Sequence, residues 1–342
     1  FQWEEINGQC SDQDTLTVNF YEQPVSDAGN GGSECDLDFG LSANASAGIG
    51  TWSQSSGPGT STYGNANDAA TTVTVSIVGT YQFTWTEVNG TCSDSATVSV
   101  DFFDQPVADA GSGGNECDLD FTFSASASFG SGTWTQVSGP GASTFTNANV
   151  DTTDVLVTAY GTYVYQWEEV NGTCSDTATV TVNYYEQPTA NAGTGGDECD
   201  LDFLLGATGS VGTGSWTQTS GPGTSTFGNA NSGTTLATAD AYGTYTYQWE
   251  EVNGTCSDSA SVTVNYYEQP TANAGLGGNE CDLDFDLGAT LSTGSGQWTA
   301  SGPGNTTFAN DTVPVSSVSV DSVGTYIFTW TETNGVCVDV DT

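Results

Sequence analysis

The chain has 342 residues, of which 42 are acidic and none is Lys, Arg or His, so its formal net charge at pH 7 is −42. Without imidazole it has no histidine base or metal ligand, and without Lys or Arg nothing in it neutralises the phosphates of a nucleic acid or an anionic membrane. Nucleic acid is therefore excluded as a partner, and the catalysis still open is a hydrolase with paired carboxylates.

The composition nevertheless predicts a folded chain. Hydrophobic residues make up 36% of it and nine are Trp, which is too apolar for a disordered acidic tail. No apolar run reaches the roughly 18 residues of a membrane span, so we expect no direct membrane insertion. The first ten residues, FQWEEINGQC, have neither the basic region nor the apolar stretch of a signal peptide. We expect the chain to be a piece of a longer protein.

A sequence repeat of fixed length organises the chain. Two series of tryptophans recur at the same constant step, namely Trp3, Trp85, Trp167 and Trp249, with Trp330 following one position early, and Trp52, Trp134, Trp216 and Trp298. The copies are close, because YQWEEVNGTCSDTATVTVNYYEQPTANAG at residues 165–193 nearly matches the stretch that begins at Tyr247. Self-similarity at a fixed period indicates a tandem array.

The first half of each copy shows short strands and turns. In the first complete copy the motif ECDLDF, residues 34–39, begins a stretch in which Leu37, Phe39 and Leu41 alternate with other residues. This period of two is typical of a half-buried strand. The motif SGPG, residues 56–59, follows a strand that contains Trp52. It places Pro and then Gly as a type II turn requires.

The second half of each copy continues in the same way. Gly-Thr-Tyr, residues 79–81, begins a late strand, and EVNGTC, residues 87–92, places Asn-Gly between two strands as in a hairpin. In ATVSVDFF, residues 96–103, apolar and polar residues alternate. No segment shows helical periodicity of useful length, so the predicted fold class is all-β.

About seven short strands, with a Trp on an early strand and Gly-Thr-Tyr opening a late one, predict tandem immunoglobulin-like (Ig-like) β-sandwich domains in a linear array. The boundaries fall at the Gln-Pro steps, because Pro cannot donate to a strand ladder. The short linkers predict a semi-rigid rod. The predicted domains are the end of a preceding repeat at 1–23, complete repeats at 24–105, 106–187 and 188–269, and a repeat at 270–342 that stops before its last strand is complete.

The pattern P-x-A-x-A-G … C … GTY-x-F-x-W-x-E-x-NG-x-C-S-D-S-A-x-V-x-V resembles the PKD-like and Ig-like repeats of giant cell-surface adhesins of the Bacteroidota. These proteins are typically exported by the type IX secretion system and include gliding-motility adhesins of the SprB type. The resemblance covers essentially the whole chain, and its motifs specify fold and habitat better than function. It implies an Ig-like sandwich, a cell-surface location and a role in adhesion or motility.

The nine cysteines alternate between a short and a long spacing, at positions 10, 35, 92, 117, 174, 199, 256, 281 and 337. In an acidic chain without histidine they predict disulfides, formed in an oxidising extracellular compartment. One kind of cysteine begins the strand in ECDLDF, and the other follows the Asn-Gly turn. In an Ig-like topology these two positions lie at opposite ends of a domain, roughly 25 to 35 Å apart. A disulfide needs Cα atoms within about 7 Å.

We therefore favour disulfides between consecutive domains, where the C-terminal end of one domain meets the N-terminal end of the next. The pairs predicted in this way are Cys35 with Cys174, Cys117 with Cys256, and Cys199 with Cys337. A different strand order would instead allow pairs within each domain, and free thiols are the third alternative. The pairs within domains are Cys35 with Cys92, Cys117 with Cys174, Cys199 with Cys256, and Cys281 with Cys337.

Domains joined in this way would also gather carboxylates without any base to pair with them. The predicted group is Glu34, Asp36 and Asp38 of one domain with Glu169 and Asp176 of the next. Ca²⁺ suits such a group, since it takes six to eight oxygen ligands in flexible geometry. Calcium at the domain junctions is therefore the one cofactor that the sequence suggests. The alternative is that Asp36 and Asp38 are solvated on the outer face of their strand.

Adjacent glutamates recur at Glu4 and Glu5, Glu168 and Glu169, and Glu250 and Glu251. Neighbouring residues on a strand point to opposite faces, so these carboxylates do not converge on one substrate. We therefore expect no catalytic residue and no enzyme.

Two surface features have a functional and a structural interpretation. The paired aromatics Phe102–Phe103 and Tyr184–Tyr185 put one ring outside, where it covers a domain joint or stacks on a sugar. Asp-Ser/Thr-Ala steps resemble the O-glycosylation signal of Bacteroidota, or are ordinary strand starts. The acceptors would be Ser95, Thr177 and Ser259, on the outward phase that a glycan requires.

The leading hypothesis is a non-enzymatic structural segment that forms the shaft of an extracellular filament or cell-surface adhesin, in adhesion or gliding motility. Its partners would be neighbouring repeats of the same chain, other copies in a filament, and a surface or glycan ligand bound by parts outside this chain. The alternative hypothesis is a carbohydrate- or partner-binding module repeated in tandem.

Overall fold

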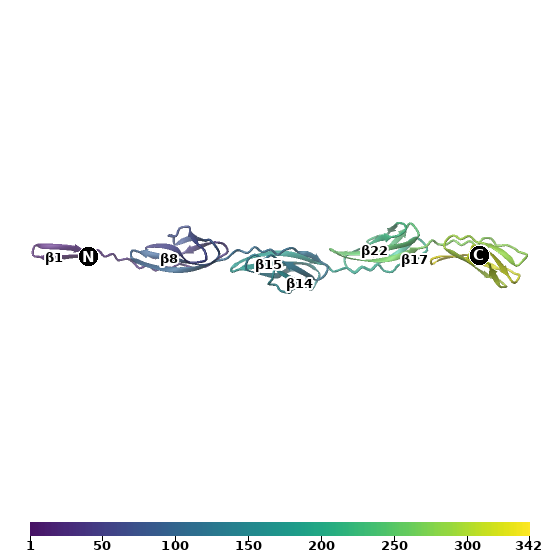
Figure 1. Ribbon diagram of the computed structural model, residues 1–342, viewed down its shortest axis with the longest axis horizontal. Helices are drawn as coiled ribbons and strands as arrows, with labels where there is room; N and C mark the ends of the chain where they lie inside the picture. The colour runs from purple at the N-terminus through teal and green to yellow at the C-terminus, as the bar shows by residue number, and fades with distance from the viewer. The chain divides into compact units, whose positions relative to one another are not determined.

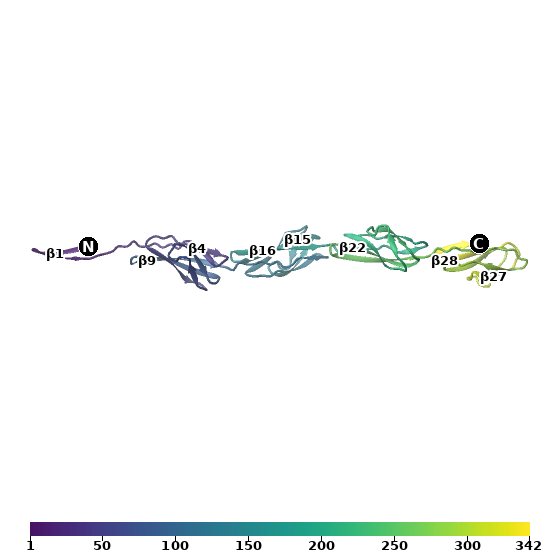
Figure 2. The ribbon, with the colours of Figure 1, turned by 90° about the horizontal axis from the view of Figure 1, so that it is seen from above.

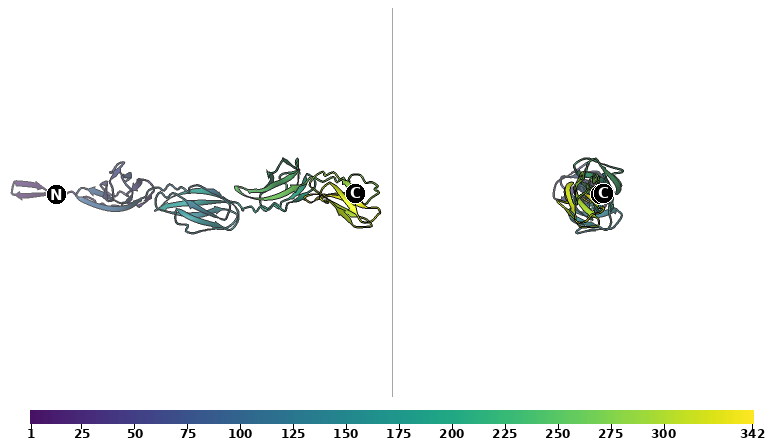
Figure 3. Two further views of the ribbon diagram at one scale, coloured as in Figure 1. Left: turned by 45° about the vertical axis from the view of Figure 1, so that its right-hand side comes forward. Right: turned by 90° about the vertical axis from the view of Figure 1, so that its right-hand side faces the viewer.

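The computed structural model describes all 342 residues. The chain consists of strands, turns and loops without a helix (Figures 1 and 3). It therefore has no helix long and apolar enough to cross a membrane. Two compact units are present: Phe1–Gly114 with Leu119–Asn183, and Asn115–Asp118 with Tyr184–Thr342.

The repeat at residues 24–105 contains seven strands in two sheets. One sheet has the order β3-β9-β8-β5 and the other has the order β4-β7-β6, so β4 and β9, both labelled in Figure 2, belong to different sheets. The short strand β3 runs parallel to the last strand, β9, and the other pairs are antiparallel. Their bounds are β3 (Gly32–Glu34), β4 (Asp38–Ser42), β5 (Ile49–Ser56), β6 (Ser61–Tyr63), β7 (Ala70–Val75), β8 (Gly79–Asn89) and β9 (Cys92–Phe102).

The next two repeats have the same strands. They are β10 (Gly114–Glu116), β11 (Asp120–Ser124), β12 (Ser131–Ser138), β13 (Ser143–Phe145), β14 (Thr152–Val157), β15 (Gly161–Asn171) and β16 (Cys174–Tyr184) in residues 106–187. In residues 188–269 they are β17 (Gly196–Glu198), β18 (Asp202–Gly206), β19 (Thr213–Ser220), β20 (Ser225–Phe227), β21 (Thr234–Ala239), β22 (Gly243–Asn253) and β23 (Cys256–Tyr266).

The two ends of the chain carry partial repeats. Residues 270–342 contain β24 (Asp284–Gly288), β25 (Ser295–Ser301), β26 (Thr306–Phe308), β27 (Val315–Val320), β28 (Ile327–Asn334) and β29 (Cys337–Asp341). At the N-terminus β1 (Gln2–Asn7) and β2 (Cys10–Thr15) form a two-stranded sheet. Because β1 and β2 have no second sheet beside them, Trp3 is 71% exposed, whereas the equivalent Trp85 is 1% exposed.

The topology is that of an Ig-like sandwich, so the all-β tandem array predicted from the sequence is confirmed. A hydrogen bond near the start of β8 is diagnostic of this topology; Figure 1 labels the strand. The Tyr81 hydroxyl donates to the carbonyl oxygen of Ile77 at 2.9 Å. This is the tyrosine corner typical of such sandwiches. Tyr163, Tyr245 and Tyr326 make the same bond to the carbonyl four residues upstream.

The core of each sandwich is centred on two tryptophans from neighbouring strands. In the first repeat Trp52 on β5 lies opposite Trp85 on β8, with ring centroids 5.3 Å apart. Both rings are buried. Gly50 makes room for this pair, because a Cβ atom there would lie 1.8 Å from the ring of Trp85. The same close approach joins Gly132 to Trp167, Gly214 to Trp249 and Gly296 to Trp330.

The predicted hairpin is present, but its turn lies one residue further on. Asn89, the last residue of β8, pairs with Cys92, the first residue of β9. The two residues of the loop between them are therefore Gly90 and Thr91. Gly90 has a φ of +64°. A two-residue loop with positive φ only at its first position is a type II′ turn.

The predicted type II turn in SGPG is wrong. That turn requires positive φ at the residue after proline, yet the positive φ of 152° belongs to Gly57 and not to Gly59. Packing explains both glycines. A Cβ atom at Gly57 would lie 2.2 Å from the ring of Tyr81, and one at Gly59 would lie 2.6 Å from its hydroxyl.

Replacing the core glycines on the β5-type strands with alanine is expected to destabilise the sandwiches. The combined variant Gly50→Ala, Gly214→Ala and Gly296→Ala overpacks three tryptophan pairs, at about 1–3 kcal/mol per sandwich. The measurement is the urea concentration at the midpoint of unfolding, with unfolding monitored by tryptophan fluorescence.

The matched control is Gly40→Ala, Gly206→Ala and Gly288→Ala. These strand glycines have no atom within 4 Å of an added Cβ, so the control should be neutral or slightly stabilising. Equal midpoints for the two triple variants would contradict the packing argument.

Candidate functional site: the joint between repeats

Three disulfides join consecutive repeats. They link Cys35 to Cys174, Cys117 to Cys256 and Cys199 to Cys337, with Cα atoms 5.5, 5.6 and 5.5 Å apart. The first cysteine of each pair lies in the bend that follows the ECDLDF glutamate, and the second begins a last strand directly after the hairpin turn. These are the pairs between domains, and the pairs within domains do not form.

The strand register of the first repeat explains why no disulfide forms within a domain. Glu34 pairs with Phe102 at the far end of β9, so the adjacent Cys35 lies beyond that end. Cys92 is the first residue of the same strand. Eleven residues of strand separate the two ends by roughly 33 Å, which no disulfide spans. Cys92, like Cys10 and Cys281, is a free thiol.

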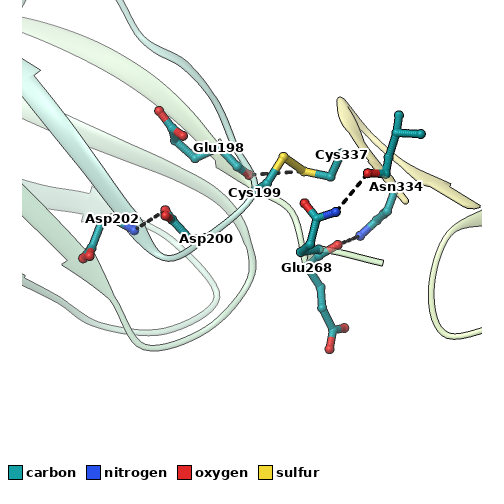
Figure 4. The surroundings of a disulfide bond; sticks show 9 residues. Glu198, Cys199, Asp200, Asp202, Glu268, Asn334 and Cys337 are labelled. Atoms are coloured by element: carbon teal, nitrogen blue, oxygen red, sulfur yellow. Dashed lines mark hydrogen bonds between the residues drawn. A yellow bond between two sulfur atoms is a disulfide. The ribbon is translucent and has the colours of Figure 1, made fainter. Parts of the chain in front are cut away.

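A peptide linker crosses each joint beside the disulfide. Figure 4 shows the joint of Cys199 and Cys337, where the Asn334 side-chain amide donates to the carbonyl oxygen of Glu268 at 2.9 Å. The Gln269 amide donates to the carbonyl of Val338 at 3.0 Å. Asn171 with Asp104 and Gln105 with Ser175 make the same two bonds in the other unit.

An aromatic ring of the linker packs on the hairpin glycine of the next repeat. A Cβ atom at Gly335 would lie 2.5 Å from the ring of Tyr267, so this position admits no side chain. Gly335 also has a φ of +62°. Phe103 contacts Gly172 and Tyr185 contacts Gly254 in the same way. The outward ring of each aromatic pair therefore covers the joint, as one of its two predicted roles requires.

The acids of ECDLDF shape the bend that carries the cysteine. Asp200 accepts a hydrogen bond from the backbone N–H of Asp202 at 3.0 Å (Figure 4). Asp202 in turn accepts from the Thr238 hydroxyl at 2.5 Å. The carbonyl oxygen of Glu198 accepts from the N–H of Tyr267 at 2.8 Å. Asp36 and Asp38 make the equivalent bonds and are exposed. Their carboxylates thus serve local turn geometry.

The calcium site predicted from Glu34, Asp36, Asp38, Glu169 and Asp176 is wrong in its ligands. Glu169 is fully buried inside its own sandwich, where it accepts from Ser128 and Trp167. Asp176 accepts from the N–H of Ala108 at 2.8 Å, also within its own repeat. No group of three or more carboxylate or thiol side chains in the chain is close enough to hold one metal ion.

The structure reveals a buried glutamate in every repeat: Glu87, Glu169, Glu251 and Glu332. Glu251 is 1% exposed. It accepts from the Ser210 hydroxyl at 2.6 Å, from the Ser210 N–H at 3.0 Å and from the Trp249 indole at 2.9 Å. Burial raises the pKa of Glu251, but these hydrogen bonds outweigh it, and the pKa lies below its ordinary value. Neutral donors thus replace the missing cations.

This glutamate anchors the first segment of its repeat. The N–H of Thr189, directly after the Gln-Pro step, donates to the Ser210 hydroxyl at 2.8 Å, which donates to Glu251. One residue on, the N–H of Ala190 donates to Asp258 on the last strand at 2.8 Å. The segment that enters the repeat is therefore fastened to its two longest strands.

The sequence did contain a signal for the buried glutamate. In the first repeat Tyr81, Phe83 and Trp85 alternate along β8, and Glu87 is the next residue on the same inward face. The strand period predicts its burial, although an acid without a cationic partner is seldom buried. The equivalent Glu169 was instead expected at the joint, because the ends of consecutive domains were expected to meet there.

The proposed glycan acceptors Ser95, Thr177 and Ser259 are exposed on last strands. Their modification stays a prediction. In the glutamate pair of the third repeat, Glu250 is exposed and Glu251 is buried, as expected for side chains on opposite faces of a strand.

Comparison with known proteins adds little beyond the fold. No protein-family model and no curated protein matches this sequence. Among solved structures, the titin I-band fragment I67–I69 is similar at 14% identity and a TM-score of 0.39, over 72% of this chain and 98% of that chain. The N-terminal eight Ig domains of Down Syndrome Cell Adhesion Molecule are 13% identical, with a TM-score of 0.35, over 99% of this chain and 57% of that chain. Immunoglobulin domains 1–5 of Sidekick-1 are 11% identical, with a TM-score of 0.34, over 98% of this chain and 82% of that chain.

Replacing Glu251 with Gln is expected to destabilise the third sandwich at neutral pH, by about 1–3 kcal/mol, because the new amide group faces donors. The folded pKa of Glu251 is depressed. Its contribution is therefore complete above the unfolded pKa of about 4.3 and is lost as the pH falls through the folded pKa. The difference in unfolding free energy should shrink below about pH 4.

Glu250→Gln is the control, since Glu250 is exposed on the same strand. Its unfolding free energy should equal that of the parent protein both at neutral pH and below about pH 4. A Glu251→Gln penalty that stays constant down to pH 3 would show that the carboxylate charge is not its origin.

Reduction of the disulfides is expected to leave the individual sandwiches folded. Each has a core of its own, and the bonded cysteines lie outside these clusters. Tryptophan fluorescence and the sharp tryptophan bands of the near-ultraviolet circular dichroism should therefore persist after reduction without denaturant, while the broad contribution of the disulfides themselves is lost. Loss of the tryptophan bands would show that the disulfides are needed for the sandwich itself.

Proposed function

We propose that this chain is a non-enzymatic structural segment, a run of Ig-like repeats in the shaft of an extracellular filament or cell-surface adhesin. The observation that supports this best is the joint. Every complete joint has the same disulfide, the same Asn and Gln hydrogen bonds to the linker and the same aromatic ring on a hairpin glycine. A chain that merely displayed separate binding modules would not need joints built alike.

The disulfides support the extracellular part of the proposal. Structural disulfides persist in oxidising compartments and are rare in the cytosol. The uniform negative charge opposes non-specific association between copies, through repulsion that acts over about 8 Å at physiological salt. The absence of Lys and Arg leaves trypsin-like proteases no site to cut, which suits a chain exposed to secretions.

The chemistry of the side chains supports a non-enzymatic role. The buried glutamates are saturated by donors of their own sandwich, and the adjacent glutamates point to opposite faces. The resemblance to Bacteroidota repeats supports adhesion or gliding motility as the process in which the shaft serves. In that setting the surface or glycan ligand is bound by other parts of the protein.

Antibodies raised against residues 188–269 test the proposal on intact cells of the source organism, imaged by electron cryomicroscopy. We expect labelled fibres that project from the cell surface, with one step along the fibre for each Ig-like repeat. Label confined to the cell interior, or to compact particles, would overturn the shaft proposal. As a second readout, a glycan array probed with the same repeat should show no binding, whereas binding would favour the carbohydrate module.

A further inference from the structure

Each joint is crossed by two covalent connections, the peptide linker and a disulfide. In the first unit the chain passes from one repeat to the next at residues 103–106, and Cys35 is bonded to Cys174 across the same joint. A force that pulls the ends of the array is carried by the shortest covalent route between them. Whether that route follows the whole polypeptide therefore depends on which cysteines are paired.

The pairing creates a route that omits most of the chain. It follows the first segment of a repeat to Cys35, crosses to Cys174, continues through β16 and the next linker to Cys199, and crosses to Cys337. The two cysteines of each disulfide on this route are separated by 139 or 138 positions in the sequence. Two repeats then contribute about 25 residues of chain instead of about 164, a contour of about 90 Å instead of about 570 Å.

A second route of the same kind uses the remaining disulfide. It follows β9 from Cys92 through the linker to Cys117, crosses to Cys256 and continues through β23 towards Cys281. Every complete repeat is thus traversed by one route in its first segment and by the other in its last strand.

The two routes are hydrogen-bonded side by side within a sandwich. In the third repeat β17 runs parallel to β23, with Gly196 opposite Val264 and Glu198 opposite Tyr266. The bond from Ala190 to Asp258 and the bond from Gln187 to Ser257 fasten the start of the first segment to the same strand. Because both strands run in the same direction, tension along the array loads them together and does not shear one past the other.

The rest of the sandwich lies on neither route. Residues 200–255 of the third repeat, which contain β18 to β22 and both core tryptophans, connect one route to the other as a side loop. Unfolding this part under load would not lengthen either route.

We propose that the disulfides convert the array into two parallel covalent load-bearing strands, so that tension bypasses the sandwich bodies and the array is nearly inextensible while oxidised. The proposal deepens the shaft function and rests on it, since a shaft is the element on which tension acts. The sandwich bodies keep the two strands aligned and provide the joints.

Single-molecule force spectroscopy on the full chain, held by its two termini, tests the proposal. With the disulfides formed, the shortest covalent path from Phe1 to Thr342 contains about 67 residues, so the extension should stop at about 220 Å. After reduction the limit should rise about fivefold, to about 1,200 Å, with separate unfolding steps for the sandwiches. Disulfides within repeats would instead set the oxidised limit at about 119 residues, or about 400 Å, and would overturn the proposal.

Two double variants provide a matched comparison. Cys35→Ser with Cys174→Ser breaks the shortest route and should raise the oxidised limit to about 620 Å. Cys117→Ser with Cys256→Ser removes one disulfide of the same kind but leaves that route intact, so the limit should stay at the parent value. Equal limits in the two variants would overturn the proposal.

These limits depend on covalent connectivity alone, so they hold even in a variant whose sandwiches are unstable. They are also independent of where the protein is found. A chain that behaves as expected under force but is absent from cell surfaces would therefore refute the shaft function without refuting the load path.

Discussion

The length of the last strand is the constraint on which the rest of the structure depends. One cysteine of each repeat begins that strand and the other lies just beyond its far end, as Cys92 and Cys35 do on either side of β9. Roughly 33 Å of strand prevents them from bonding to each other. Each must find its partner in a neighbouring repeat, and the disulfide becomes a connection between domains.

The joint is assembled from groups whose other tasks lie within a sandwich. The hairpin turn that connects β22 and β23 also presents Gly254 to the ring of Tyr185 and the amide of Asn253 to the linker carbonyl of Glu186. The adjacent Cys256 forms the disulfide. One tight turn therefore supplies the ring contact, the hydrogen bond and the covalent bond, which explains why NGTC recurs with so little change.

The chain has 42 acidic residues and no Lys, Arg or His, so its carboxylates accept hydrogen bonds from neutral donors instead of pairing with cations. Glu251 is satisfied inside the sandwich by a hydroxyl, an indole and backbone N–H groups, and Asp258 by the N–H of Ala190. At the surface Asp200 closes a turn by accepting from the backbone of Asp202. These carboxylates are used singly and locally, and no three of them lie close enough together to hold one metal ion.

The sequence by itself determined the repeat, the all-β class and the Ig-like topology, because periodic tryptophans, alternating strands and glycine turns are local patterns that any copy displays. It also favoured the pairs between domains, since strand length and rise set the distance between Cys35 and Cys92 before any coordinates are known. Pairs within domains stayed open only because the strand order was an inference.

Only the tertiary structure decided where individual polar groups go. The position of Glu169 on its strand is the same whether it faces a joint or a core, and the choice depends on Ser128, which is 41 residues away in sequence. Likewise, the glycines of SGPG are explained by the ring of Tyr81, which no local turn rule contains. Contacts between residues far apart in the chain leave no periodic trace, so local patterns predict the strands but not the partners of their side chains.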